Sequence, residues 1–239
     1  MATILLTRPQ TVSAQLAKDL QRQGYKTIIE PLLTIAPTNI PRPATDAQAV
    51  MITSSNTLAA LEENNENVGD LLHRPCFTVG PRTKNRAEMF GFTNVQTTNG
   101  DSDDLAHFIA SNSKGPVLHI AGQDIDAKSH DALHNAAIEV SHWPVYTATP
   151  ADTLSPHVIS LIKKQEIDAV LLFSPRTAAT LAKLISSNAL EACCKSLIAI
   201  GLSEAVIDPL RPLNWRQLLA APVPTEDAVI TCLNAALPV

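Results

Sequence analysis

The chain has 239 residues, a length that fits one large domain or two small ones. Hydrophobic residues make up 45% of the chain and charged residues 17%, which is typical of folded globular proteins and excludes a disordered class. The net charge of -5 provides no basic field for nucleic acid, and no apolar run is long enough to cross a membrane. Any anionic ligand must therefore be bound by local groups.

The cysteines and the first residues favour a cytoplasmic protein. Cys76, Cys193, Cys194 and Cys232 show no CxxC spacing, so we expect no zinc site. The opening sequence MATILLTRPQ has no basic segment and only a short apolar run, so it does not resemble a secretory signal. A reducing cytoplasm is the compartment that these features predict.

The opening segment predicts a strand, a helix and a second strand. Residues 3–7 form a short apolar run, residues 12–22 have helical spacing, and residues 25–30 are again typical of a strand. Gly24 is the residue type that commonly ends a helix. Such a unit predicts a parallel sheet with a right-handed crossover, and hence the α/β class.

Two proline-rich segments divide the chain. The first is PLLTIAPTNIPRPATDAQ, beginning at Pro31, and the second is WPVYTATPADTLSP, beginning at Trp143. Both favour extended connectors over helices. Two connectors imply an inserted domain, so we expect one discontinuous lobe of residues 1–36 and 151–239 and an inserted lobe of residues 37–150.

Alternating strand and helix patterns predict a five-stranded sheet in each lobe. In the inserted lobe we expect strands at 49–53, 76–79, 94–97, 117–120 and 139–146, with helices at 57–63, 83–90, 103–111 and 127–137. In the other lobe, beyond the opening unit, we expect strands at 169–173 and 197–200 and helices at 177–185 and 226–236, so these ranges place four of its five strands.

The two lobes also share short sequences in the same order. MITSSNTLAAL at position 51 matches LLFSPRTAATL at 171, and in both an apolar strand ends in a serine before a helix. FTVGPRTKNRAEMF at 77 matches IAIGLSEAVIDPL at 198, which aligns Gly80 with Gly201. A third pair aligns Ser102 with Thr225 as predicted helix N-caps. Duplication is the economical explanation.

These shared segments are junctions between a strand and a helix, where open α/β sheets bind their ligands. The N–H groups at a helix start bind anions without any net positive charge. For a single junction a purely structural role is the commoner explanation, because Ser, Thr and Gly are preferred at caps and turns. The coordinated recurrence favours a ligand site, with the junctions of the two lobes facing a common cleft.

The segments ILLTRP, PLLTI, the paired junctions, VYTATP and PTEDAV, in this order over nearly the whole chain, resemble the uroporphyrinogen-III synthase family. The resemblance implies two flavodoxin-like lobes with parallel five-stranded sheets, joined by a two-stranded connector. It implies the cyclisation of hydroxymethylbilane, a linear tetrapyrrole with eight carboxylates, to uroporphyrinogen III. In that reaction water is lost and the last pyrrole ring is inverted through a spiro intermediate. The resemblance implies no cofactor and no metal. We expect a monomer whose partner is this small substrate, with no nucleic acid and no membrane.

Carried over one residue at a time, the resemblance assigns the acid that protonates the leaving hydroxyl to Tyr146 in VYTAT. A phenol with an ordinary pKa near 10 is protonated at pH 7 and can donate to a departing oxygen. Without the resemblance, a packing tyrosine would be equally expected. The hydroxyl-bearing junctions of the family match Ser54, Thr83, Ser174 and Thr225, which we assign to the binding of substrate carboxylates.

Two arginines are further candidates for carboxylate binding. Arg176 follows the second serine junction and Arg8 follows the first strand, and a guanidinium can bind a carboxylate through two hydrogen bonds. Either side chain could instead face water. The second lobe departs from the family pattern because Glu204 stands where the family usually has threonine, which puts substrate contact there in doubt.

Other motifs carry less weight. His130 and His134 stand one helical turn apart, but HDALH lacks the glutamate of a zinc-binding HExxH motif, so we expect a solvated helix face. His119 and Gln123, at the end of the strand VLHI, could line the cleft, but a hydrogen-bonded core histidine is the default expectation for His119. The chain has no GxGxxG, P-loop or GxSxG motif.

Two other functions remain open from the sequence. A two-lobed binding or sensing protein would keep the cleft for a carboxylate-rich ligand without turnover. An enzyme acting on a phosphorylated small molecule would use the same helix starts.

Overall fold

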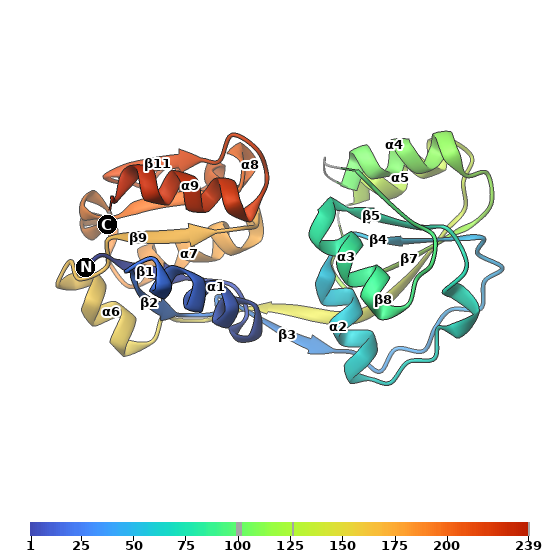
Figure 1. Cartoon of the computed structure of the whole chain (residues 1–239), viewed down its shortest axis with the longest axis horizontal. Helices are drawn as coiled ribbons and strands as arrows, with labels where there is room; N and C mark the ends of the chain where they lie inside the picture. Colours follow the sequence, from blue (N-terminus) through green and yellow to red (C-terminus); the bar gives the residue numbers. More distant parts are fainter. Residues whose placement is uncertain (99–101, 126, 239) are drawn as a thin grey trace. The chain divides into compact units, whose positions relative to one another are not determined.

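The computed structural model of the chain describes residues 1–98, 102–125 and 127–238. Contacts between residues divide the chain into two compact units, drawn in Figure 1. Unit 1 consists of Met1–Thr34 and Thr149–Val239, and unit 2 consists of Ile35–Ala148. Unit 1 is therefore assembled from two stretches of chain that are separated in sequence by the whole of unit 2.

Unit 1 contains, within the described residues, a five-stranded sheet in which every pairing is parallel. In spatial order its strands are β11 (Gln217–Ala220), β10 (Ile198–Gly201), β9 (Ala169–Leu172), β1 (Thr3–Leu6) and β2 (Lys26–Ile29). The three inner strands are almost completely buried. Their unbroken apolar runs are typical of parallel strands that are covered on both faces.

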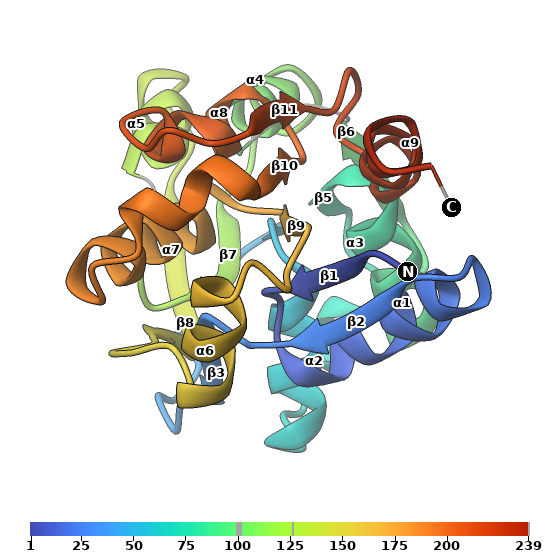
Figure 2. The same cartoon turned by 90° about the vertical axis from the view of Figure 1, so that its left-hand side faces the viewer.

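Helices lie on both faces of the unit 1 sheet, as Figure 2 shows. One face is covered by α1 (Gln10–Arg22) and α9 (Glu226–Ala236). The other is covered by α6 (Pro156–Lys163), α7 (Pro175–Ser187), α8 (Glu204–Ile207), η2 (Glu191–Ser196) and η3 (Asp208–Leu210). Gly24, with φ of 94°, adopts the left-handed conformation that ends α1, as expected.

Unit 2 contains a six-stranded sheet among the residues that the structure describes, so the expected count of five strands is wrong for this lobe. In spatial order the strands are β3 (Leu33–Pro37), β8 (Val140–Pro150), β7 (Val117–Gly122), β4 (Ala49–Ile52), β5 (Cys76–Val79) and β6 (Val95–Thr98). The extra strand, β3, comes from the proline-rich segment that we expected to be only a connector. It lies at the edge of the sheet, where a proline without an N–H group is tolerated.

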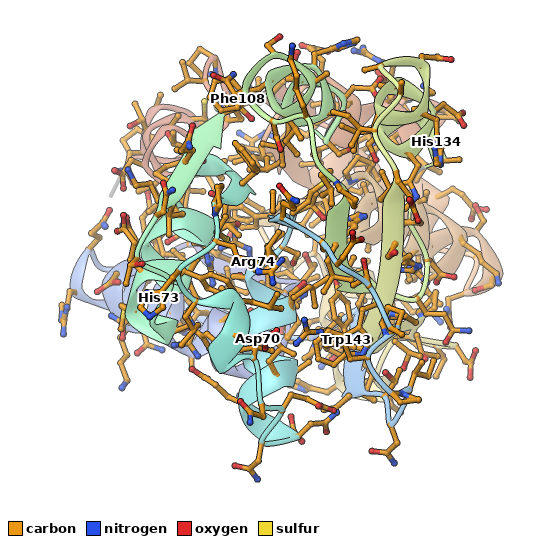
Figure 3. All side chains as sticks on the ribbon, turned by 90° about the vertical axis from the view of Figure 1, so that its right-hand side faces the viewer. Asp70, His73, Arg74, Phe108, His134 and Trp143 are labelled. Carbon is orange, nitrogen blue, oxygen red and sulfur yellow. The ribbon has the colours of Figure 1, made fainter. Side chains whose placement is uncertain are left out.

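Helices also cover both faces of the unit 2 sheet. On one face lie α2 (Ser55–Glu63) and α3 (Gly80–Phe90), with η1 (Gly69–Leu71), and on the other lie α4 (Ser102–Asn112) and α5 (Ala127–Asn135). In Figure 3, Phe108 and His134 lie on the side of α4 and α5, and Asp70 and Trp143 lie towards the opposite side. The fully buried Trp143 belongs to the core beneath α2 and α3.

Three details of the structure differ from the sequence analysis. The strand β11 and the helix α6 were not predicted, although α6 begins with a regular cap in which the Val158 N–H donates to Ser155 Oγ (3.3 Å). Ser102, expected to be an N-cap, is instead the first residue of α4, and position 101 lies outside the described residues.

Candidate active site

In each sheet the strand order reverses at one point, and at least one predicted site residue follows a strand that borders this reversal. In unit 1 the reversal lies between β1 and β9, which are followed by Arg8 and Ser174. In unit 2 it lies between β4 and β7, and Ser54 follows β4. Open α/β sheets bind ligands outside the carboxyl ends of their strands at such reversals. The predicted residues therefore lie where a ligand site is expected in each unit.

Arg8 is held by two neighbours at the reversal in unit 1. Its Cζ lies 3.5 Å from the centroid of the Phe173 ring, and Nη1 forms an ion pair with the Glu226 carboxylate. The Arg8 side chain is 18% exposed and that of Glu226 is 41% exposed. Phe173 precedes Ser174 and Glu226 follows Thr225, so these contacts bring three of the predicted binding residues into one cluster. The stacked guanidinium is oriented before any ligand arrives.

Three of the predicted hydroxyls cap helices. The Ser54 hydroxyl accepts a hydrogen bond from the Asn56 N–H (3.2 Å), and the Thr225 hydroxyl accepts one from the Ala228 N–H (3.2 Å). The Ser174 hydroxyl accepts from the Thr177 N–H (3.1 Å). These bonds use one acceptor site of each oxygen and give each residue a structural role. Their contact with a substrate carboxylate stays a prediction.

Arg176 lies in the first turn of α7, beside Ser174. Its side chain is half-buried, and its carbonyl oxygen accepts a hydrogen bond from the Thr180 hydroxyl (2.9 Å). The position is next to the cluster of Arg8 and Phe173, because both Phe173 and Arg176 belong to the junction between β9 and α7. Binding of a carboxylate by Arg176 stays a prediction.

Thr83 is the fourth residue of α3 and is 6% exposed. The start of this helix differs from those of α2, α7 and α9, because the residue before it, Val79, caps no N–H group with its side chain. Gly80 has φ of 73°, and a Cβ atom built on it would meet nothing within 4 Å. The start of α3 therefore has no side-chain cap and lies beside open space at Gly80, although Pro81 supplies no N–H group there. An uncapped helix start of this kind favours an anion.

The matching junction of unit 1 has a different structure. Its helix, α8, has only four residues, and a Cβ atom on Gly201 would lie 2.5 Å from Ile207 Cγ2. The space that is open at Gly80 is thus filled at Gly201. The exposed Glu204 carboxylate forms an ion pair with Arg211 Nη2. A negative side chain at a short, filled helix start does not favour substrate carboxylates, in line with the departure seen in the sequence.

Tyr146 lies on β8 opposite Gly122, the last residue of β7. It is half-buried and packs against the core that contains Trp143 and Val145. The Gln123 N–H donates to the Tyr146 carbonyl oxygen (2.8 Å), so the backbone of β8 is tied to the residue that follows β7. Because β7 borders the reversal in unit 2, the tyrosine lies near the edge where Ser54 is found.

The same unit contains three histidines in contact, on the side of α5. His119 Nδ1 and His130 Nε2 share a hydrogen bond of 2.8 Å, and the His119 and His142 ring centroids are 5.8 Å apart. His119 is 2% exposed and is a hydrogen-bonded core histidine, as expected. The expected solvated face is wrong for His130, which packs half-buried against His119, whereas His134 is exposed.

Burial, together with smaller contributions from the neighbouring His130 and His142, lowers the pKa of His119 to about 3. Burial also lowers the pKa values of His130 and His142. All three rings are therefore neutral at pH 7. Among the described residues, no group of three or more His, Cys, Asp or Glu side chains is arranged to hold a metal ion. None of the described helices has both the length and the apolarity needed to span a membrane.

Comparison with protein families connects this geometry to a known group. A family model described as uroporphyrinogen-III synthase HemD matches residues 14–231. The chain belongs to this family. A search of curated proteins found no match.

Solved structures of uroporphyrinogen-III synthases share the fold of this family member. The enzyme from Helicobacter pylori is 15% identical, with a TM-score of 0.68 over 98% of this chain and 99% of that one. A mutant of the enzyme from the extremely thermophilic bacterium Thermus thermophilus is 14% identical, with a TM-score of 0.65 over 99% of this chain and 98% of that one. At this identity the likeness establishes the mixed α/β fold with two mainly parallel sheets.

Sequence reasoning missed three residues that shape the site. Phe173 was treated as the end of a strand, and Glu226 only as an acidic residue in the first turn of a helix. Gly122 belongs to no glycine motif. The sequence offered no signal for their contacts. Phe173 and Glu226 both contact Arg8, which is far from them along the chain. The importance of Gly122 is visible only from its pairing with Tyr146.

Proposed function

We propose that this family member cyclises hydroxymethylbilane to uroporphyrinogen III, with loss of water and inversion of the last pyrrole ring. This reaction would make it a cyclising hydro-lyase. The observation that carries the proposal is the placement of Tyr146, which lies against the end of β7 beside the strand-order reversal in a chain of this family. The phenol would donate its proton to the hydroxyl oxygen, which departs as water, so that the pyrrole ring is left as an electrophilic azafulvenium cation.

The regiochemistry of ring closure depends on how the flexible substrate is held. Unguided closure gives the uninverted isomer, so the enzyme must orient the chain for attack by the substituted carbon of the last ring. The substrate has eight carboxylates through which it can be bound. The chain carries a net charge of -5, so these carboxylates must be bound by local donors and not by a general positive field.

The local donors that we assign lie in both units. In unit 1 they are Arg8, Arg176 and the starts of α7 and α9 at Ser174 and Thr225. In unit 2 they are the starts of α2 and α3 at Ser54 and Thr83. The stacking of Arg8 on Phe173 and the open space beside Gly80 support this assignment.

We also propose that the two units are the discontinuous and inserted domains expected from the sequence. Counted along the chain, unit 1 has the strand order 2-1-3-4-5 of flavodoxin-like sheets, whereas the five parallel strands of unit 2 have the order 3-2-1-4-5. The flavodoxin-like description is therefore proposed for unit 1 alone. The two-stranded connector would be β3 and β8, the strands in which the chain passes between the units.

We further propose that the protein acts as a monomer in the cytoplasm. The four cysteines are free thiols, which suits a reducing compartment.

The decisive experiment is isomer analysis. Hydroxymethylbilane is incubated with the protein, the products are oxidised, and type III and type I uroporphyrin are separated by chromatography. We expect mainly type III from the wild type. Formation of type I alone at the uncatalysed rate would refute the proposal, and a tight tetrapyrrole complex without turnover would then point to a binding protein.

The role of Tyr146 is tested with the Tyr146→Phe variant. Removal of a general acid typically costs about 10²-fold or more in rate, and substrate orientation leaves residual activity. Tyr25→Phe is the matched control, because Tyr25 is the other tyrosine of the chain and its hydroxyl donates to the Leu237 carbonyl oxygen (2.7 Å) in unit 1. Equal activity losses in the two variants would contradict the acid role.

A further inference from the structure

The end of β7 pairs with β8 through a β-bulge. The register runs from Val117 opposite Val140 to Ala121 opposite Pro144, and then Gly122 pairs with Tyr146, so that Val145 is an extra residue on β8. A bulge re-aims the side chains that follow it. In regular alternation Tyr146 would point away from the face occupied by Val145, whereas in the structure both residues contact the same core.

The tyrosine ring occupies the space where Gly122 lacks a side chain. A Cβ atom built on Gly122 would lie 2.8 Å from both Cε2 and Cζ of Tyr146 and 3.1 Å from its hydroxyl oxygen. The first two distances are shorter than real carbon contacts. Any larger residue at position 122 would therefore displace the end of the ring that carries the hydroxyl.

Further contacts fix the backbone on which the ring lies. The His142 Nε2–H donates to the Gly122 carbonyl oxygen (3.0 Å), and the Gln123 N–H donates to the Tyr146 carbonyl oxygen (2.8 Å). The first contact holds the last peptide of β7, and the second holds the peptide of Tyr146. These two bonds hold the peptides from which Gly122 and the Tyr146 ring extend.

We infer that Gly122 is a positioning residue for Tyr146, with His142 supporting it through the Gly122 carbonyl. This inference rests on the proposed function, since it assigns the phenol the role of acid. The lack of a side chain at position 122, together with the bulge, sets where the hydroxyl meets the leaving oxygen. Gly122 itself touches no reacting atom.

The size of the effect follows from the distances. Ordinary carbon contacts begin at about 3.4 Å, so relief of the clash in Gly122→Ala moves the ring by roughly half an ångström or more. A misplacement of about 1 Å can cost about 10²-fold in rate. We therefore expect kcat to fall by roughly 10-fold to 10²-fold, with KM changed less than about 2-fold, because the carboxylate-binding junctions are untouched.

The test combines kinetics with a direct readout of the tyrosine. The chain has two tyrosines, Tyr25 and Tyr146, so labelling with 3-fluorotyrosine gives two ¹⁹F resonances, which Tyr25→Phe and Tyr146→Phe assign. In Gly122→Ala the Tyr146 resonance should shift while that of Tyr25 stays in place. Gly69→Ala is the matched control in the same unit, because a Cβ there meets only the flexible Asn67 side chain at 3.3 Å.

A double-mutant comparison separates positioning from general damage. If Gly122 acts through the hydroxyl, Gly122→Ala should cost less than about 2-fold in kcat in the Tyr146→Phe background, where the hydroxyl is absent. Equal losses in both backgrounds, or an unchanged Tyr146 resonance, would overturn the inference. Failure of the wild type to form type III product would instead refute the proposed function, and the fluorine spectrum is independent of that result.

A second pair of variants applies if Gly122→Ala does not fold. His142→Leu removes the donor to the Gly122 carbonyl, whereas His142→Gln keeps an N–H group at a similar reach. We expect the leucine variant to shift the Tyr146 resonance and to lower kcat. In the glutamine variant the resonance and kcat should both be close to those of the wild type. An unshifted resonance in the leucine variant, or no restoration by glutamine, would contradict the supporting role of His142.

Discussion

We expect unit 2 to lose stability as the pH falls from 7 to 5, because burial holds the pKa of His119 at about 3. In the unfolded chain this histidine has a pKa near 6.5, so between these two values the unfolded state binds more protons than the folded state. The free energy of unfolding then falls as the pH is lowered. The stabilisation is complete above pH 6.5 and is lost progressively below it.

The magnitude follows from the two pKa values. Between pH 7 and pH 5 the linkage relation gives a loss of about 2 kcal/mol from His119 alone. His130 and His142 act in the same direction, because burial lowers their pKa values as well. A loss of this size is a substantial fraction of the 5 to 15 kcal/mol by which most domains are stable.

The two tryptophans allow the effect to be located. Trp143 is buried in unit 2 and Trp215 lies in unit 1, so fluorescence in a Trp215→Phe background reports unit 2. Urea unfolding is measured at pH 7, 6 and 5 for this protein and for its His119→Gln and His73→Gln variants. His73 is the control because it lies exposed in the same unit. Only His119→Gln should reduce the change in the free energy of unfolding between pH 7 and pH 5. An equal change in all three proteins would refute the reasoning.

Three further predictions concern the binding junctions. Arg8→Gln should raise KM about 10-fold with a smaller effect on kcat, as steady-state kinetics would show, and an unchanged KM would remove Arg8 from the site. Ser174→Ala should lower the free energy of unfolding by about 1 kcal/mol in urea titrations, because it removes the cap of α7. Glu204→Gln should change KM less than about 2-fold, since α8 offers no carboxylate site; a marked fall in KM would contradict this.

The buried elements could be predicted because their signals are local. Ala49–Ile52 and Ala169–Leu172 are unbroken apolar runs, and both strands are completely buried. The helices that follow them begin immediately after Ser54 and Ser174, the serines whose hydroxyls cap them. Apolar runs and N-caps act within a few residues of chain, so the sequence alone indicates them.

The elements that were missed depend on distant partners. The strand β11 forms because it can pair with β10, and β3 enters the unit 2 sheet because β8 offers an edge. The contact between Arg8 and Glu226 joins residues 218 positions apart. The bulge at Tyr146 exists only in relation to β7. Pairing register and ion-pair choice are tertiary properties, and local pattern does not contain them.

The repeated junctions differ in structure between the two units, and the carboxylate sites that we propose for them differ accordingly. In unit 2 the start of α3 has no side-chain cap and lies beside open space at Gly80, so we propose that the helix dipole attracts a carboxylate there. In unit 1 the matching start is filled by Ile207, and the group that we propose for carboxylate binding is Arg8, which is stacked on Phe173 and paired with Glu226 at the neighbouring reversal. A helix start and a single guanidinium both attract an anion only over a short distance. Because a net charge of -5 provides no general attraction for a polycarboxylate, we expect the positions of these groups to determine how the substrate lies.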